Sequence, residues 1–479
     1  MVTSNHSRSR RRSKQPSVKS IKLEFADDPV TAFGGLALTE RLATRLGLWS
    51  ALDGALPRRS GRYSWLDVIK SSVAGLLTGS RGTVSCEEVR ADSALRALLG
   101  VSGAPEEATF WRDLARLGSP DYVSRLERVQ RWWARRTLAA APRGALLRSG
   151  FFQLFGDGSL LEGSRRREGT KTLRDKGSGL MWSAWFAGPA LAAQRLAGPG
   201  QGEQSCLRAM LPEVLREVVD PLNLRAKTLL LQDSLHGDGP TLDLAEAEGV
   251  KYLIGANKLA ETQRVLRERV EMEWSERGAV KAWGWSESAV CLCWIQCAGW
   301  TRKRLLVGRR WRREDELPGM PYHFSGIVTN LCEADVAHLR KGGGSLVDVL
   351  WRLYDGKGAC EDLFKDILED LSGHHPPCEE LVRNRGYYAL VSLAHTLACG
   401  VDVIAGAAET GRGDTRRQDG GRRKRSKPRR MRLWRLRRRL LAIPARIGVR
   451  GRQATVTALG VAAEIAAQLR AWFLRLSRC

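Results

Sequence analysis

The sequence has 479 residues and a net charge of +26, from 78 Lys and Arg against 52 Asp and Glu. Its hydrophobic content of 43% is ordinary for a folded chain of roughly two to four domains. Such a basic surplus favours a polyanionic partner, most often nucleic acid, over a small neutral substrate. We therefore expect a folded protein whose surface attracts phosphates.

Targeting signals are not evident. The N-terminal stretch 8–14 is basic, but no apolar core follows it, which argues against a signal peptide. We find no apolar run approaching the ~18 residues of a membrane span and expect no membrane contact.

The ten cysteines form no paired framework, which suits a reducing cytoplasm. Cys291, Cys293 and Cys297 could suggest zinc, but no second pair lies at ligand spacing.

Residues 21–145 are predicted to be mostly helical. Leu42 and Leu46 share one helical stripe. Ser64 is a plausible cap for a helix that runs to about Leu77. A helical module ahead of a catalytic core suits DNA end binding or dimerisation, and a lid that completes the core is an equally good interpretation.

From residue 150 the pattern changes to strands, and two of them are predicted to end at an aspartate. The aromatic run Phe151–Phe155 is followed by Asp157 between two glycines, and the apolar run 227–232 ends at Asp233. If these strands are neighbours, the carboxylates lie side by side at a sheet edge. Asp238 is a rival second ligand, although its Gly-Asp-Gly-Pro setting is typical of a turn.

The order of the elements predicts a fold. A Gly-Pro hairpin joins two further strands, and two helices separate the strands that follow. The resulting order, strand, hairpin, helix, strand, helix, strand, matches a ribonuclease-H-like mixed-sheet core of the α+β or α/β class. These elements are expected at residues 180–186, 190–196, 202–219, 227–233, 241–248 and 250–254.

Residues 259–332 are predicted to form a β-rich insertion. The segment is rich in tryptophan and contains the run Arg309, Arg310, Trp311, Arg312 and Arg313. Basic residues interleaved with aromatics suit a surface that grips phosphates and stacks on bases. For most of these tryptophans, the core of the insertion is the better interpretation.

A third carboxylate follows in a predicted helix. Lys357, Glu361, Lys365 and Leu368 lie near one face of it, just after Tyr354. The basic pair brackets Glu361, a candidate third metal ligand.

The tail carries much of the charge. Between Arg412 and Arg452 there are 18 Lys and Arg and two Asp, a net +16. Its first half is rich in Gly and Arg and is expected to be disordered, and the rest to be helical. The predicted organisation is a basic arm, a helical domain, a first core segment, an insertion, a second core segment, a basic linker and a basic helical C-terminal region, at residues 1–20, 21–145, 146–258, 259–332, 333–405, 406–430 and 431–479.

At residues 354–368 the chain resembles bacterial insertion-sequence transposases of the DDE type, in the branch with a Tyr-x-x-Arg-x-x-x-Glu-x-x-x-x-x-x-Lys signature. The resemblance extends over roughly residues 25–455, and the signature is its specific part. Further segments that are similar to this family lie at residues 89–100, 108–114, 231–235, 326–331 and 385–397.

The resemblance implies that Asp157, Asp233 and Glu361 hold two Mg²⁺ ions, for which Mn²⁺ can substitute. Two such ions ~3.5–4 Å apart activate the nucleophile and stabilise the leaving oxygen. It also implies a bacterial, cytoplasmic, nucleoid-associated homodimer on double-stranded DNA, with the terminal inverted repeats and a target as partners. The expected DNA-binding residues are Tyr354, Lys357, Lys365, Arg309, Arg310, Trp311, Arg312, Arg313, Arg435 and Arg438.

Two positions depart from the signature. Lys357 replaces its Arg and loses a bidentate phosphate contact, and Leu368 replaces its Lys, for which Lys365 is a partial substitute. A catalytically decayed transposase acting as a DNA-binding protein is therefore the alternative. A structure-selective nuclease on the same core is a third hypothesis, and an RNA-binding protein, which leaves the acids unexplained, is the last.

Overall fold

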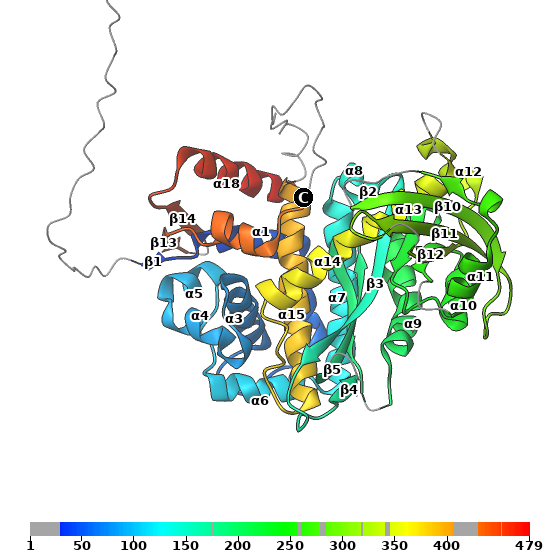
Figure 1. Ribbon diagram of the computed structural model, residues 1–479. Helices are drawn as coiled ribbons and strands as arrows, with labels where there is room; N and C mark the ends of the chain where they lie inside the picture. The colour runs from blue at the N-terminus through cyan, green and yellow to red at the C-terminus, as the bar shows by residue number, and fades with distance from the viewer. Residues whose placement is uncertain are drawn as a thin grey trace, which may run out of the picture.

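The structure is a computed structural model, and it is mixed α/β, with one large mixed sheet and many helices (Figure 1). The predicted basic arm, nearly all of the linker 406–430 and Trp283 lie outside the residues that it describes. The described residues are 29–173, 177–198, 200–256, 260–277, 284–317, 320–340, 345–406, 430–451 and 453–479.

The sheet has eleven strands, in the order β4-β5-β3-β7-β8-β12-β11-β10-β9, with β2 beside β3 and β6 beside β5. Only β3, β7 and β8 are parallel to one another; the other pairs are antiparallel. The strands are β2 (Leu147–Arg148), β3 (Phe151–Glu162), β4 (Lys171–Leu173), β5 (Gly177–Ala187), β6 (Ala190–Leu196), β7 (Thr228–Gln232), β8 (Lys251–Gly255), β9 (Ser275–Glu276), β10 (Trp285–Ile295), β11 (Arg304–Arg313) and β12 (His323–Thr329).

The parallel strands form the buried centre of the sheet. All five residues of β7 are buried, and so is the first half of β3. Parallel strands are covered on both faces and therefore read as continuous apolar runs, which is the pattern of these segments. Helix α7 (Pro120–Ala140) packs on β6, and α9 (Glu203–Val214) packs on β5.

The β-rich segment 259–332 continues the central sheet. Its last strand, β12, pairs antiparallel with β8, so that Val328 lies opposite Ile254. Strands β11 and β10 then extend the same sheet outward. The segment also contains the helix α11 (Ala260–Glu268), which packs against β12.

The N-terminal helices share one hydrophobic core with the sheet. In Figure 1, α1 and α3 to α6 lie on one side of α15 (Leu381–Val401), and the sheet lies on the other side together with α7 and α8. Helix α15 approaches α6 (Glu107–Leu117) very closely, since a Cβ at Gly118 or Gly386 would overlap the backbone of the other helix. The other N-terminal helices are α1 (Ala37–Leu46), α2 (Leu48–Ala55), α3 (Trp65–Thr78), α4 (Glu87–Ala91), α5 (Ser93–Leu99), α6 (Glu107–Leu117) and α8 (Arg143–Leu146).

Helix α15 corrects one expectation. With its continuation to Gly406 it is 26 residues long and is apolar enough to cross a membrane by length and composition. The prediction that no apolar run approaches this length was wrong, because Leu381–Gly406 contains few charges. Its most apolar window is 94% buried inside the molecule, against α3, α6, α7 and β6. The core of this fold therefore accounts for its apolar character.

The C-terminal region is not wholly helical as predicted. After α17 (Leu433–Leu436) and a π-helical turn, β13 (Ala445–Arg450) and β14 (Gln453–Ala458) form a hairpin that pairs with β1 (Val30–Thr31). Gly451 turns this hairpin with a φ of 58°, which glycine adopts readily. The chain ends in α18 (Ala463–Leu476), which packs on α1.

Candidate active site

Asp157 and Asp233 lie at equivalent positions of neighbouring parallel strands. The register pairs Phe155 of β3 with Leu231 of β7, and each aspartate follows two residues later. β7 ends at Gln232, directly before Asp233. The prediction that β3 also ends at its aspartate was wrong: β3 runs on to Glu162, because β5 continues to pair with it.

The Asp157 carboxylate lies among other charges. Burial raises the pKa of Asp157, the Lys357 ammonium lowers it, and the negative charges of Asp233 and Glu203 raise it further. Lys357 Nζ is 3.4 Å from Asp157 Oδ2, and Asp157 Oδ1 accepts a hydrogen bond from the Gly158 N–H at 2.9 Å. Asp157 is thus a crowded carboxylate that a bound cation would stabilise.

Sequence reasoning missed two further members of this site, His236 and Glu203. The side chain of His236 is fully buried. Its Nε2 lies 3.0 Å from Glu203 Oε1, 3.4 Å from Asp233 Oδ1 and 4.0 Å from Asp157 Oδ1. His236 could have been found by its place three residues after a candidate ligand. Glu203 had no such signal, because only the packing of α9 brings it here.

These side chains suit a divalent cation. Ligand atoms of Asp157, Asp233 and His236 all lie within 4.8 Å of one another. In the part of the chain that the structure describes, Glu203 Oε1 and both ring nitrogens of His236 are buried without a well-aligned hydrogen-bond partner. A Cβ at Gly158 would overlap the Glu203 side chain, so glycine is needed there to admit this fourth group. Carboxylates beside orphaned buried polar atoms are the donor set that a cation would satisfy.

Glu361 lies across a pocket from Asp157. It is exposed on α14 (Gly358–Lys365) and lines a pocket of about 860 Å³ together with Asp157, Lys365 and Leu368. Its carboxylate is not in the group of close ligand atoms that holds the two aspartates. Asp157 and Glu361 thus line one pocket, and Asp233 lies beside Asp157 at the end of β7. Between β7 and α14 the chain also forms the helices α10 (Gly239–Ala247), α12 (Glu333–Val336) and α13 (Leu346–Tyr354).

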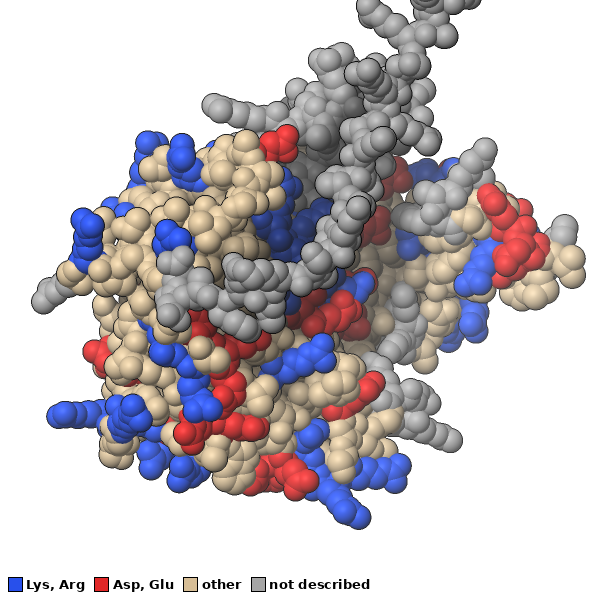
Figure 2. Space-filling view, turned by 90° about the vertical axis from the view of Figure 1, so that its left-hand side faces the viewer, with Lys and Arg blue, Asp and Glu red and all other residues tan. Residues whose placement is uncertain are grey.

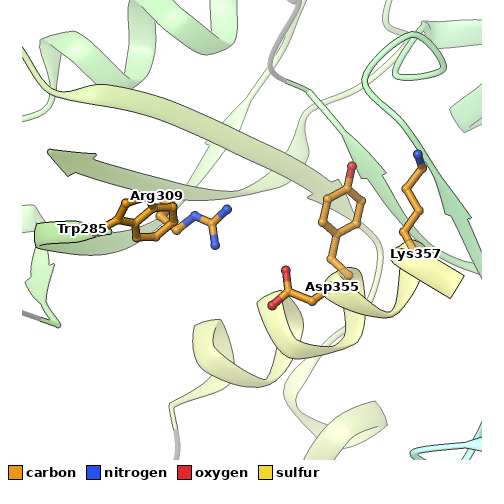
Figure 3. Close-up of a pocket in the computed structure, with 6 residues that line it drawn as sticks. Trp285, Arg309, Asp355 and Lys357 are labelled. Atoms are coloured by element: carbon orange, nitrogen blue, oxygen red, sulfur yellow. The ribbon is translucent and has the colours of Figure 1, made fainter. Parts of the chain in front are cut away.

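Tyr354 and Lys357 flank the aspartates from a helix break. α13 ends at Tyr354, a 3₁₀ turn covers Asp355–Lys357, and α14 follows, in place of one continuous helix. Burial raises the pKa of Tyr354 to about 12. A Cβ at Gly255 would lie 2.7 Å from its hydroxyl, so the end of β8 makes room for this ring. In Figure 3, Lys357 points away from Asp355 and toward the strands.

The basic run on β11 is divided between two faces of the sheet. Arg309 lies over the rings of Trp351 and Trp285, 4.0 and 4.7 Å from the centroids. Trp311 stacks on Trp285 with the ring centroids 4.9 Å apart. Burial lowers the pKa of Arg309 to about 10. Figure 3 shows its guanidinium facing the Asp355 carboxylate across a pocket of about 520 Å³ beside Lys357.

The other face of β11 carries Arg310 and Arg312. Arg310 is 5% exposed and forms ion pairs with Glu271 and Glu276. Arg312 lies 4.1 Å from the Tyr322 ring centroid and 3.6 Å from a Glu287 oxygen. Internal partners thus account for both guanidinium groups. The alternation of strand side chains separates them from the surface on which Arg309 and Trp311 lie.

The remaining basic candidates are exposed. Lys365 stands at the pocket that holds Glu361. Arg313 lies at the end of β11, and Arg435 and Arg438 lie on the C-terminal helical segment. In Figure 2, Lys and Arg side chains are spread over one face of the molecule and gather with acidic side chains in a recess.

The weaker ligand candidates have other roles. Asp238 caps α10 by accepting a hydrogen bond from the Thr241 N–H and pairs with Arg208 at 2.6 Å. Cys291 and Cys293 lie on β10 and belong to none of the groups of close ligand atoms among the described residues.

Comparisons with known proteins give a distant likeness. No protein-family model and no curated protein sequence matches the chain. Among solved structures, the piggyBac transposase synaptic complex with hairpin DNA is similar to this chain with a TM-score of 0.36 and 10% identity. The match covers 80% of this chain and 76% of the other. Similarity at this level does not assign the chain to a family.

Proposed function

We propose that the chain is a DDE transposase that binds the terminal inverted repeats of its own insertion sequence and catalyses DNA cleavage and strand transfer. The observation that carries this proposal is the juxtaposition of Asp157 and Asp233 on adjacent parallel strands, with Glu361 lining the same pocket. Carboxylates are the donors that Mg²⁺ and Mn²⁺ prefer, and Asp233 and Glu361 each lie near Asp157, one beside it and one in the pocket that it lines.

The strand order supports a ribonuclease-H-like core. β6, β5 and β3 are successive antiparallel neighbours, and β7 and β8 follow as parallel neighbours of β3. Helix α9 lies in the chain between β6 and β7, and α10 lies between β7 and β8. This is the order that the sequence suggested for such a core. We therefore propose that β9–β12 are an insertion that continues the sheet of this core.

The proposed chemistry is phosphodiester hydrolysis followed by strand transfer. Two divalent ions bound at the carboxylates would activate the attacking hydroxyl and stabilise the leaving oxygen. Asp157 and Asp233 would hold them from the sheet and Glu361 from α14. Lys357 and Tyr354, beside the aspartates, would contact the DNA at the cleaved phosphate, and Lys365 would do so from the rim of the pocket.

We propose double-stranded DNA as the partner, both the ends of the element and the target, bound by a homodimer in the bacterial cytoplasm. The net charge of +26 supports a polyanionic partner. Arg309, Trp311, Arg313, Arg435 and Arg438 are the candidates for contacts outside the pocket. The internal ion pairs of Arg310 and the partners of Arg312 make these two the weaker candidates.

A catalytically decayed transposase that retains DNA binding is the second candidate. Leu368 stands where the resembled family has a Lys, and it lines the pocket beside Lys365. A leucine cannot bind a phosphate, so one contact to the DNA end would be missing. The two candidates differ in one property, which is metal-dependent cleavage.

The test uses the purified full-length chain and a labelled DNA fragment that carries its gene with both flanks. We expect Mg²⁺- or Mn²⁺-dependent cuts at the ends of the element, absent in Asp157→Ala although DNA binding persists. Asp220→Ala, which removes an ion pair with Arg225, is the matched control and should cut normally. Equal cleavage by Asp157→Ala and the wild type would exclude the proposal. End binding without any cut would favour the decayed protein.

A further inference from the structure

The His236 imidazole is buried among three carboxylates. Its side chain has no exposed surface, and Nε2 lies 3.0, 3.4 and 4.0 Å from oxygens of Glu203, Asp233 and Asp157. Among the described residues neither ring nitrogen has a well-aligned hydrogen-bond partner, although Nε2 lies at ion-pair distance from the Glu203 oxygen. A buried polar group without a partner is costly, and such groups mark sites that a ligand completes.

The backbone around His236 holds the ring in place. Asp233 Oδ1 accepts a hydrogen bond from the Leu235 N–H at 2.8 Å, and the Asp233 carbonyl accepts one from the His236 N–H at 3.3 Å. The Gln204 side-chain amide donates to the Leu235 carbonyl and ties this turn to α9. The same helix presents Glu203. The imidazole is therefore positioned before any ion binds, which reduces the ordering cost of binding.

We propose that His236 Nε2 is a nitrogen ligand of the cation held between Asp157 and Asp233, and that it makes this site bind Mn²⁺ and Co²⁺ in preference to Mg²⁺. The inference rests on the proposed function only in taking the two aspartates as ligands of a divalent cation. Glu203 is the third carboxylate around Nε2. Mg²⁺ favours oxygen donors, whereas an imidazole ligand raises the affinity for transition ions in the order Mn²⁺, then Co²⁺.

The measurement is Mn²⁺ binding to the full-length, DNA-free protein, by titration calorimetry and by pulsed electron paramagnetic resonance. A nitrogen bound to Mn²⁺ couples its nuclear spin to the electron spin of the metal. We expect this ¹⁴N coupling in the wild type and its loss in His236→Gln. We also expect His236→Gln to bind Mn²⁺ at least ~10-fold more weakly, while Mg²⁺ affinity changes much less. His323→Gln, which removes an exposed histidine paired with Glu316, is the control.

Two results would overturn the inference. One is the absence of ¹⁴N coupling in the wild type, a measurement that needs no variant and so does not depend on the folding of His236→Gln. The other is a folded His236→Gln with unchanged Mn²⁺ affinity. Asp157→Ala separates this inference from the proposed function. Undiminished Mn²⁺ binding by that variant would reject the aspartates as ligands and with them both proposals. A wild-type protein that shows the ¹⁴N coupling to Mn²⁺ but does not cleave DNA would reject only the proposed transposase activity.

Discussion

Asp157 stands between two glycines, and each has a different neighbour. A Cβ at Gly156 would overlap the ring of Trp185, and one at Gly158 would overlap the side chain of Glu203. Trp185 is 1% exposed and its indole N–H donates to the Leu207 carbonyl at 2.9 Å, so the ring has no room to move. The glycines thus leave room on β3 for Trp185 and Glu203, before and after the Asp157 position along the strand.

We expect Gly156→Ala to destabilise the protein by about 1–3 kcal/mol, the usual cost of overpacking a core. Urea denaturation of the variant measures this change. Gly144→Ala is the control, because a Cβ at this position in α8 meets no atom within 4 Å and Ala is the better helix former. A Gly156→Ala protein as stable as the wild type would mean that the Trp185 ring is free to shift.

In the metal-free protein, the Lys357 ammonium supplies the positive charge beside Asp157. Burial lowers the pKa of Lys357, but the charges of Asp157 and Asp233 outweigh this and raise it overall. We expect Lys357→Met to lower the melting temperature of the metal-free protein and to gain more stability from Mn²⁺ than the wild type does, since the ion replaces the lost charge. Thermal melts with and without Mn²⁺ provide the measurement. Lys365→Met, on the exposed rim of the pocket, is the control. If Mn²⁺ stabilised Lys357→Met and the wild type equally, the prediction would be contradicted.

Between elements, one ion-pair network ties α10 to β11. Arg304 is 2% exposed and donates to Glu246 at 2.8 Å, and it also contacts Asp243. Tyr252 on β8 donates its hydroxyl to the same Glu246 at 2.7 Å. The network thus joins the predicted insertion to the helix that follows Asp233. Within this network, the ionisation of the Glu246 carboxylate can be tested by varying the pH.

The pKa of Glu246 gives a pH-dependent prediction. Burial raises this pKa, but the hydrogen bonds from Arg304, Tyr252 and Arg302 outweigh burial and lower it to about 2. A carboxyl whose pKa is lower in the folded state contributes stability above its unfolded pKa, and this contribution is lost as the pH falls toward the folded pKa.

We therefore expect Glu246→Gln to be less stable than the wild type at pH 7 by ~1–2 kcal/mol, allowing for partial solvent screening. The difference should shrink as the pH falls from about 4.5 to about 2. Urea denaturation over this pH range measures it. Glu268→Gln, in an exposed pair with Arg264, should show almost no difference at any pH. A Glu246→Gln deficit that is independent of pH would contradict the assignment.

At the scale of the whole molecule, only part of the basic surplus is available at the surface. The chain carries +26, but much of the described charge is neutralised internally, as at Arg304 and Arg310. Charge that is available to DNA must come from exposed side chains such as Arg435 and Arg438. Such contacts release counterions, so each one steepens the dependence of binding on salt.

We expect DNA end binding to weaken steeply between 50 and 200 mM salt, by on the order of 10³-fold if about six phosphates are contacted. The double variant Arg435→Ala and Arg438→Ala should reduce the salt slope by about 2. Arg264→Ala, whose guanidinium pairs with Glu261 and Glu268, removes a charge without removing a DNA contact and is the control. An unchanged salt slope in the double variant would mean that these two arginines do not contact the DNA.

Much of the architecture follows from local pattern. The aromatic and leucine runs predicted β3 and β7, the Gly-Pro turn predicted the hairpin between β5 and β6, and Ser64 begins α3 with the expected cap. These signals are local, because strand periodicity, turn residues and caps act over a few neighbouring residues. The hairpin at Gly451 was missed because the Leu- and Arg-rich stretch 431–447 was interpreted as a helix, although its last residues belong to the first strand of the hairpin.

The sequence by itself determined which residue types could form a site: the aspartates after two apolar runs, the acid on a later helix and the basic surplus. Only the tertiary structure decided which of them meet. The parallel register of β3 and β7 sets Asp157 beside Asp233, and the packing of α9 brings in Glu203. The alternation of β11 side chains assigns Arg309 and Arg310 to opposite faces. Such contacts join residues far apart in the chain, and their geometry depends on packing that no local pattern encodes.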